Sequence, residues 1–88
     1  MHKPNYTNQF RKDIKRLQKR GLDMNQIKGV MSTLINAKPL ESKHKNHALK
    51  GNLKGYSECH VAPDWLLIYY VEGNTITFTR TGTHADLF

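Results

Sequence analysis

The sequence has 88 residues, 38% apolar and 24% charged, which suits one small globular domain spanning residues 1–88. No apolar stretch approaches the roughly 20 residues of a membrane span, and the N-terminus lacks the apolar core of a signal peptide. The single cysteine, Cys59, has no partner for an internal disulfide, which agrees with a reducing compartment. We therefore expect a cytoplasmic protein that does not associate with a membrane.

The formal charge of +7 is unevenly distributed along the chain. Up to Lys54 the chain carries thirteen Lys or Arg residues and three acidic ones, a charge of +10, whereas from Gly55 on it carries −3. A basic N-terminal half suits a polyanionic partner, and nucleic acid is the default polyanion of the cytosol. The alternative is a small basic protein that binds nothing specific.

A helical hairpin is predicted in the basic half. Thr7 is expected to cap a first helix that begins near Asn8 and ends at Gly21, and Asp23 to begin a second one. Each helix has an apolar face at spacings of three and four: Phe10, Ile14 and Leu17 in the first, and Ile27, Val30, Met31, Leu34 and Ile35 in the second. Six basic residues on the first helix form either an RNA-facing surface or a solvated face: Arg11, Lys12, Lys15, Arg16, Lys19 and Arg20.

Residues 38–54 lose this periodicity and predict a long polar loop. Strands are predicted over residues 56–61, 65–71 and 75–81, the second apolar on both faces as a central strand would be. Gly73 and Asn74 have the signature of a two-residue hairpin turn. That turn predicts cross-strand pairs between Glu72 and Thr75, Val71 and Ile76, Tyr69 and Phe78, and Leu67 and Arg80.

This meander gathers polar residues at one end of the sheet, namely His60, Asp64, Trp65 and Arg80, with His84 just beyond. Cleavage of RNA without a metal needs a base for the 2′-hydroxyl proton, an acid for the leaving 5′-oxygen and positive charge at the phosphate. Histidine serves as either base or acid near neutral pH, and arginine binds phosphate oxygens bidentately. Unpaired bases stack on aromatic side chains such as Trp65 and Phe88.

Each of these residues also has a structural interpretation. Trp65 and Phe88 are alternatively core residues, Arg80 the ion-pair partner of Asp64, and His60 a donor to a backbone carbonyl. Cys59 is expected to be a buried apolar residue, because strand alternation points it away from His60. A zinc site formed by Cys59, His60, His47 and His84 lacks any spacing typical of zinc ligands.

Four motifs occur in order at residues 47–51 (HALKG), 54–56 (KGY), 60–69 (HVAPDWLLIY) and 80–88 (RTGTHADLF). Together they resemble the YafQ branch of the RelE-like bacterial toxins, over nearly the whole chain. The resemblance implies a RelE-like α+β fold, with an N-terminal helical hairpin packed on a small, mainly antiparallel β-sheet. It also implies an mRNA endoribonuclease that needs no metal or cofactor and cuts in the ribosomal A site. The implied partners are this mRNA, a cognate antitoxin and, only through the antitoxin complex, operator DNA.

The resemblance also implies roles for individual residues. His84 is expected to be the general acid, His60 or Asp64 the base with His47 assisting, and Arg80 the ligand of the scissile phosphate. Trp65 and Phe88 are expected to hold the mRNA, and Lys50 and Lys54 to bind the same substrate.

The chain departs from the family pattern at Leu53, Ser57 and Ala48, where the family often has tryptophan, arginine and proline. The missing arginine removes a possible phosphate contact. The alternative function is a non-catalytic RNA- or ribosome-binding protein that blocks translation. A DNA-binding regulator is a weaker alternative, because neither helix follows a helix-turn-helix pattern.

Overall fold

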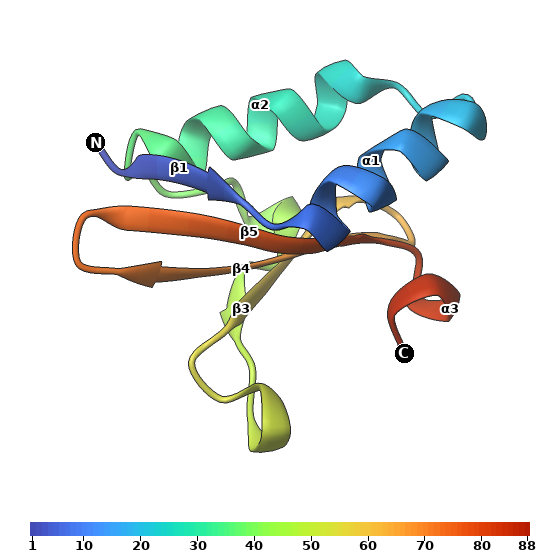
Figure 1. Cartoon of the computed structure of the whole chain (residues 1–88). Coiled ribbons are helices and arrows are strands. Elements are labelled where there is room, and N and C mark those ends of the chain that lie inside the picture. The colour runs from blue at the N-terminus through green and yellow to red at the C-terminus, as the bar shows by residue number, and fades with distance from the viewer.

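The computed structural model describes residues 1–88 as a five-stranded sheet with two long helices on one face. The strands lie in the order β1-β5-β4-β3-β2, and only β1 and β5 are parallel. Figure 1 shows α1 and α2 on one side of the sheet, with α3 and the loop that carries β2 on the other. The expected α+β fold is therefore confirmed. The elements are β1 (Lys3–Tyr6), α1 (Asn8–Lys19), α2 (Met24–Ile35), β2 (His47–Ala48), β3 (Ser57–Ala62), β4 (Trp65–Glu72), β5 (Thr75–Gly82) and α3 (His84–Leu87).

Local signals in the sequence account for the ends of the two long helices. The Thr7 hydroxyl accepts a hydrogen bond from the backbone N–H of Phe10, and the Asp23 carboxylate accepts one from Asn25. Gly21 adopts φ +85°, the left-handed conformation that commonly follows a helix end. No helix of the structure is both long and apolar enough to span a bilayer.

The core lies between the helical hairpin and the inner face of the sheet. Its strand residues alternate along β3, β4 and β5, so each of these three strands contributes every second side chain. Removing a large apolar side chain of this kind from water contributes about 1.5–3 kcal/mol. The core residues are Phe10, Leu17, Ile27, Val30, Leu34, Cys59, Val61, Trp65, Leu67, Tyr69, Ile76 and Phe78.

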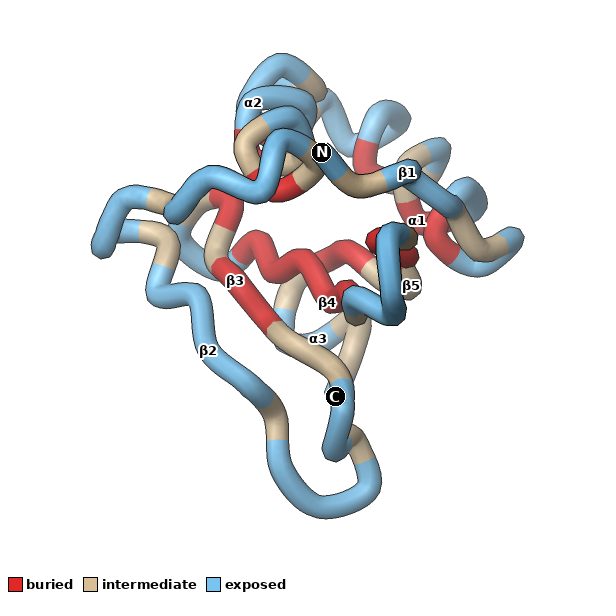
Figure 2. The backbone as a smooth tube through the Cα atoms, turned by 90° about the vertical axis from the view of Figure 1, so that its left-hand side faces the viewer, coloured by how far each residue is buried: buried red, intermediate tan, exposed pale blue.

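Strand β4 is also buried on its outer face, as expected for a central strand. Leu66 and Ile68 point away from the core yet have almost no exposed surface. Figure 2 shows the buried stretch of β4 in red, and the segment that carries β2 exposed in pale blue. The predicted polar loop contains short 3-10 turns at Ser42–His44 and Gly51–Leu53, on either side of β2.

The hairpin register differs from the predicted one because β5 has a β-bulge at Thr79. The pairs nearest the turn form as predicted, including Tyr69 with Phe78. The register then shifts, so that Arg80 pairs with Ile68 instead of Leu67, and Thr81 takes the position opposite Leu67. Because neighbouring residues point to opposite faces, this one-residue shift moves Arg80 from the core face to the outer face.

Candidate active site

The outer face of the sheet, away from α1 and α2, carries a row of polar side chains. Glu58 and His60 alternate along β3 and pair with Ile68 and Leu66 of β4. His47 of β2 pairs with Glu58 on the other side. Because paired residues share a face, the register aligns Glu58 with Arg80 across β4. The structure thus places His47, His60 and Arg80 on one face of the sheet, whereas the predicted register had put Arg80 on the core face.

Asp64 and His84 complete this row at the end of the sheet. Asp64 occupies the tight turn between β3 and β4 with φ +54°, a conformation that aspartate tolerates better than most residues. Its Oδ1 lies 2.7 Å from the His84 ring Nδ1 and accepts a hydrogen bond of 3.0 Å from the His84 backbone N–H. The backbone N–H, and then the ring, hold the pKa of Asp64 below its ordinary value.

This contact determines which ring nitrogen of His84 carries the proton when the ring is neutral. An ionised carboxylate can only accept, so the Nδ1 of His84 carries a proton and donates it to Asp64. The Nε2 atom then accepts a proton when the ring is neutral and donates one when it is charged. His84 is also next to two other candidate residues, because its ring centroid lies 6.2 Å from that of His60 and 6.5 Å from that of Phe88.

Glu58 belongs to the same cluster, although the sequence analysis did not single it out. Its Oε1 lies 3.8 Å from the Nε2 of His47 and 4.0 Å from the Nε2 of His60, and the residue is only 7% exposed. Strand alternation was the available signal, since Glu58 and His60 are two residues apart. These candidate catalytic residues, called the catalytic cluster below, are His47, Glu58, His60, Asp64 and His84.

Arg80 has a different ionic partner from the Asp64 considered in the sequence analysis. Its Nε lies 2.8 Å from Oδ2 of Asp13 in α1, and its Nη2 lies 3.3 Å from Oδ1. Asp13 is fully buried and also accepts hydrogen bonds from Arg16, Gln9 and the backbone N–H of Thr81. Burial opposes its ionisation, but the hydrogen bonds led by Arg80 outweigh burial and hold the pKa of Asp13 below its ordinary value.

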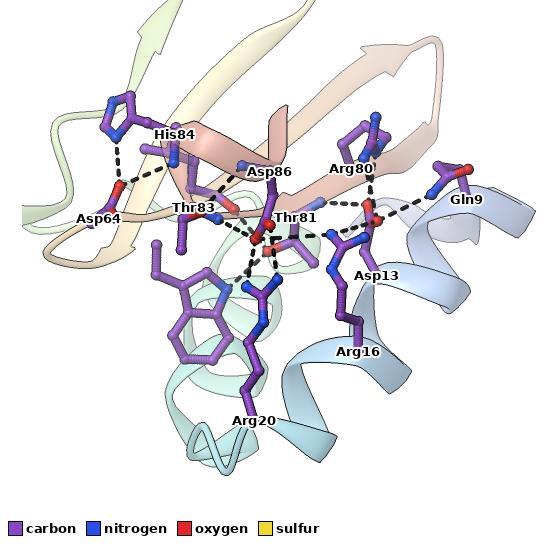
Figure 3. A network of polar contacts seen from close by, with 12 residues as sticks. Gln9, Asp13, Arg16, Arg20, Asp64, Arg80, Thr81, Thr83, His84 and Asp86 are labelled. Carbon is purple, nitrogen blue, oxygen red and sulfur yellow. Dashed lines mark hydrogen bonds and ion pairs between the residues drawn. The ribbon is translucent and has the colours of Figure 1, made fainter. Parts of the chain in front are cut away.

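Arg16 of α1 and Arg20, which directly follows α1, form ion pairs within the fold. Arg20 forms a bidentate ion pair with Asp86 of α3, with N–O distances of 2.7 and 2.9 Å, and Arg16 bonds to Asp13 at 3.0 Å. Figure 3 shows this network running from Arg80 to α3. Four basic residues of α1 remain as an exposed basic surface: Arg11, Lys12, Lys15 and Lys19.

Trp65 is a core residue, so the expectation that it stacks on a base is wrong. It is 3% exposed, and its indole N–H donates to the Thr81 hydroxyl at 2.9 Å. Thr81 in turn donates to the carbonyl of Leu66. Both faces of the indole are covered, and its one polar atom is satisfied inside the protein.

The remaining predicted binding residues lie at the surface. Phe88 is 64% exposed beside His84, which rules out the alternative that it covers the core. Lys50 and Lys54 are exposed at the two ends of the Gly51–Leu53 turn. His44 places its ring Nδ1 2.6 Å from the carbonyl oxygen of His60 and so links the loop to β3.

Metal-ligand geometry is absent from the cluster: no three or more His, Cys, Asp and Glu side chains are arranged to hold a metal ion. Cys59 is fully buried on the core face, as predicted, whereas His60 lies on the outer face. Burial raises the pKa of the Cys59 thiol to about 12, which keeps it protonated and unreactive.

The sequence profile of the family described as "Bacterial toxin of type II toxin-antitoxin system, YafQ" matches residues 2–88. The mRNA interferase toxin YafQ of Escherichia coli K12 is 50% identical over 84 residues, covering 94% of this chain and 91% of that protein.

Two solved structures are similar over their full length. A copper-bound mutant toxin from Helicobacter pylori superposes with a TM-score of 0.96 at 38% identity, covering all of both chains. The E. coli DinJ-YafQ complex gives a TM-score of 0.92 at 47% identity, covering 100% of this chain and 99% of that one.

The family profile and the fold together show the class of protein, which is the toxin component of a type II toxin-antitoxin system. Within that class, the chain belongs to the YafQ family.

Proposed function

We propose that this chain is a ribosome-dependent, metal-independent mRNA endoribonuclease that inhibits translation in the cytoplasm, acting as a single domain of residues 1–88. The observation that carries the proposal is the 2.7 Å contact between Asp64 and His84, beside His60, on the outer face of the sheet. The name mRNA interferase of the E. coli relative at 50% identity supports the same activity.

The proposed reaction is attack of the 2′-hydroxyl on the adjacent phosphate. A base removes the 2′-hydroxyl proton, the 2′-oxygen bonds to phosphorus, and the bond from phosphorus to the 5′-oxygen breaks. An acid protonates that leaving oxygen, which gives a 2′,3′-cyclic phosphate and a 5′-hydroxyl end. Proton transfer by positioned side chains contributes typically about 10²–10⁴-fold to such a rate.

The cluster offers a candidate for each proton transfer. His84 is assigned as the general acid, because Asp64 holds its Nδ1 and leaves Nε2 to face the leaving group. His60 is assigned as the base, with Glu58 and His47 beside it. Asp64 is the weaker candidate, because its lowered pKa makes it a poor proton acceptor.

Arg80 is assigned to the scissile phosphate. Asp13 binds its Nε and Nη2, so the guanidinium is held in one orientation while Nη1 has no partner within the chain. A fixed cation at this position stabilises the negative charge that develops in the transition state. The Arg80 side chain is 34% exposed, which leaves it accessible to a phosphate.

The remaining binding residues surround this cluster. Phe88 presents an exposed ring for a base, and Lys50 and Lys54 are assigned as exposed cations for the phosphates of the message. A groove of about 950 Å³ between α2, the Ser42–His44 turn and β3 also reaches His60. We assign the ribosomal A site as the place where the message is held for cutting, and a cognate antitoxin as the inhibitor. Operator DNA would be bound only through the antitoxin complex.

Primer extension on message from cells expressing the chain tests the proposal. Wild type is expected to give new 5′ ends within codons, whereas His84→Ala and Arg80→Ala give at least tenfold fewer. Glu72→Gln, at the far end of β4, serves as a control that still cuts. Stalled ribosomes on uncut message would instead indicate a non-catalytic translation inhibitor. Full cutting by both site variants would overturn the assignment of the active site.

A second arm tests metal independence. Protein treated with EDTA and then desalted is added to programmed ribosomes, so that the ribosomes keep their magnesium. Unchanged cutting is expected. Loss of cutting that a transition metal restores would contradict this part of the proposal.

A further inference from the structure

Arg20 lies outside the catalytic cluster but is joined to the helix that carries His84. Its Nη1 and Nη2 lie 2.7 and 2.9 Å from Oδ2 and Oδ1 of Asp86, a two-bond pairing between a guanidinium and a carboxylate. The Asp86 side chain is only 13% exposed, and the bonds from Arg20 hold its pKa well below the ordinary value. Arg20 is the first residue after α1, whereas Asp86 lies in α3.

Asp86 has a second function at the start of α3. Its Oδ2 accepts a hydrogen bond of 3.0 Å from the Thr83 backbone N–H, and its own backbone N–H donates to the Thr83 hydroxyl at 3.2 Å. This reciprocal capping box fixes the first turn of α3, of which His84 is the first residue. One carboxylate therefore ties Arg20 to the helix start that orients His84, as Figure 3 shows.

Gly82 makes the close approach of Asp86 possible. A Cβ atom at this position would lie 2.9 Å from both the Cβ and the Oδ2 of Asp86, which is closer than such atoms approach. The absence of a side chain at Gly82 thus lets Asp86 fold back toward Arg20.

Helix α3 depends on such contacts from outside. It has four residues, and a helix this short is unstable in water without tertiary contacts. None of its residues is buried. Polar contacts to other parts of the fold therefore help to set its position, and the shortest are the Arg20 pair with Asp86 and the Asp64 contact to His84.

We propose that Arg20 is a positioning residue for His84, acting through Asp86 and the first turn of α3. This inference rests on the proposed function, in which His84 is the general acid. Arg20 holds α3 so that the His84 ring stays against Asp64 and next to His60. Without Arg20, α3 samples other positions, and the acid is in place for only part of the time.

Removal of Arg20 is expected to leave the protein folded. Arg16 lies 3.9 Å from Asp86 and still compensates its charge, and the core contains neither Arg20 nor Asp86. The competing explanation is that Arg20 binds RNA phosphate directly as one more cation of α1. That role changes the concentration of toxin needed for half-maximal cutting, whereas a positioning role changes the maximal rate.

The experiment measures single-turnover cutting on programmed ribosomes over a range of toxin concentrations. Arg20→Ala is expected to lower the maximal cutting rate about tenfold, because misplaced catalytic groups react more slowly. The toxin concentration that gives half of the maximal rate is expected to change little. Arg20→Lys keeps the charge but not the two-bond pairing, and is expected to restore part of the rate. Lys19→Ala removes one charge from the same end of α1 and is the matched control, expected to leave the maximal rate unchanged.

The decisive comparison is made in a His84→Ala background. If Arg20 acts through His84, adding Arg20→Ala to His84→Ala causes no further loss, which is the signature of two residues acting as one unit. An equal tenfold loss in both backgrounds would overturn the proposal, as would equal rates for Arg20→Ala and Lys19→Ala.

A second readout does not depend on cutting. NMR spectra of isolated Arg20→Ala are expected to show changed His84 and Phe88 resonances, with strand resonances unchanged. Unchanged His84 resonances would also overturn the proposal. If His84→Ala itself cuts fully, the assignment of His84 as the general acid fails, while the spectra still report whether Arg20 positions α3.

Discussion

The Nε atom of Arg80 lies 2.8 Å from Oδ2 of Asp13, a carboxylate with no surface exposed to solvent. Asp13 also accepts the backbone N–H of Thr81 at 3.1 Å. That N–H lies on the edge of β5 opposite β4, beyond the point where pairing with β1 ends at Phe78. Asp13 therefore accepts hydrogen bonds both from a backbone N–H at the open edge of the sheet and from a candidate catalytic arginine. These bonds join α1 to the candidate active site.

Asp13→Asn should weaken the fold, since it leaves Arg80 without its charged partner. We expect the free energy of unfolding in urea to fall by about 2–3 kcal/mol, at the low end for a broken buried pair because Arg80 is partly hydrated. Glu41→Gln is the control, because the 3.9 Å pair of Glu41 with Lys43 is exposed. Equal stability of the Asp13 variant and wild type would contradict this role of Asp13.

Stability should fall in acid. Asp13, Asp64 and Asp86 have pKa values held below their ordinary value in the folded protein. The unfolded chain therefore binds more protons, so the free energy of unfolding falls as pH drops from about 5 through the lowered values. Urea titrations at several pH values test this. The free energy of unfolding should depend less on pH in Asp13→Asn than in wild type. A wild-type free energy of unfolding that does not change with pH would refute this prediction.

Trp65 is the single tryptophan, so its fluorescence reports on the core alone. We expect weak quenching by iodide in the folded protein, and no added quenching by a short single-stranded RNA. Thr81→Val removes the partner of the indole N–H and should cost roughly 1–3 kcal/mol of stability. Strong iodide quenching in the folded state would show instead that the ring is open to solvent.

Glu58 should matter for cutting although it bears no catalytic proton in the proposed reaction. Glu58→Gln removes the carboxylate that lies between His47 and His60, and we expect the cutting rate on ribosomes to fall about tenfold or more. Glu72→Gln again provides the control. A rate equal to wild type would show that the two histidines act without Glu58.

The sequence predicted the features that depend on local signals. The Thr7 cap, the helix end near Gly21 and the turn at Gly73 and Asn74 follow from short-range chemistry, and the structure confirms them. Alternation also placed Cys59 in the core.

Other features depend on partners far away in the chain. The bulge at Thr79 is supported by hydrogen bonds from the Thr7 hydroxyl to the Thr79 carbonyl, and from the Thr79 hydroxyl to the Ile68 carbonyl. No periodicity within residues 75–81 indicates those contacts. Likewise, only the folded chain brings Asp86 to Arg20, whose charge the sequence assigns either to an RNA-facing surface or to a solvated face.

The orientation of Trp65 illustrates the same limit. A tryptophan next to candidate catalytic residues fits base stacking and core packing equally well in sequence. The shift that places Thr81 opposite Leu67 provides the indole with a partner in the core. By contrast, the burial of Asp13 was predictable from the sequence, because Asp13 lies three residues after Phe10 and four before Leu17, on the buried face of α1.

A cutting assay on a message with one 2′-deoxy nucleotide tests most directly whether the 2′-hydroxyl attacks the adjacent phosphate. The substitution is made on the 5′ side of the bond mapped by primer extension, and the message is loaded on ribosomes with wild-type protein. Attack by the 2′-hydroxyl predicts no cutting at that bond, with the unmodified message cut normally to a 2′,3′-cyclic phosphate. Undiminished cutting at the 2′-deoxy position would contradict the proposed chemistry of the histidine cluster.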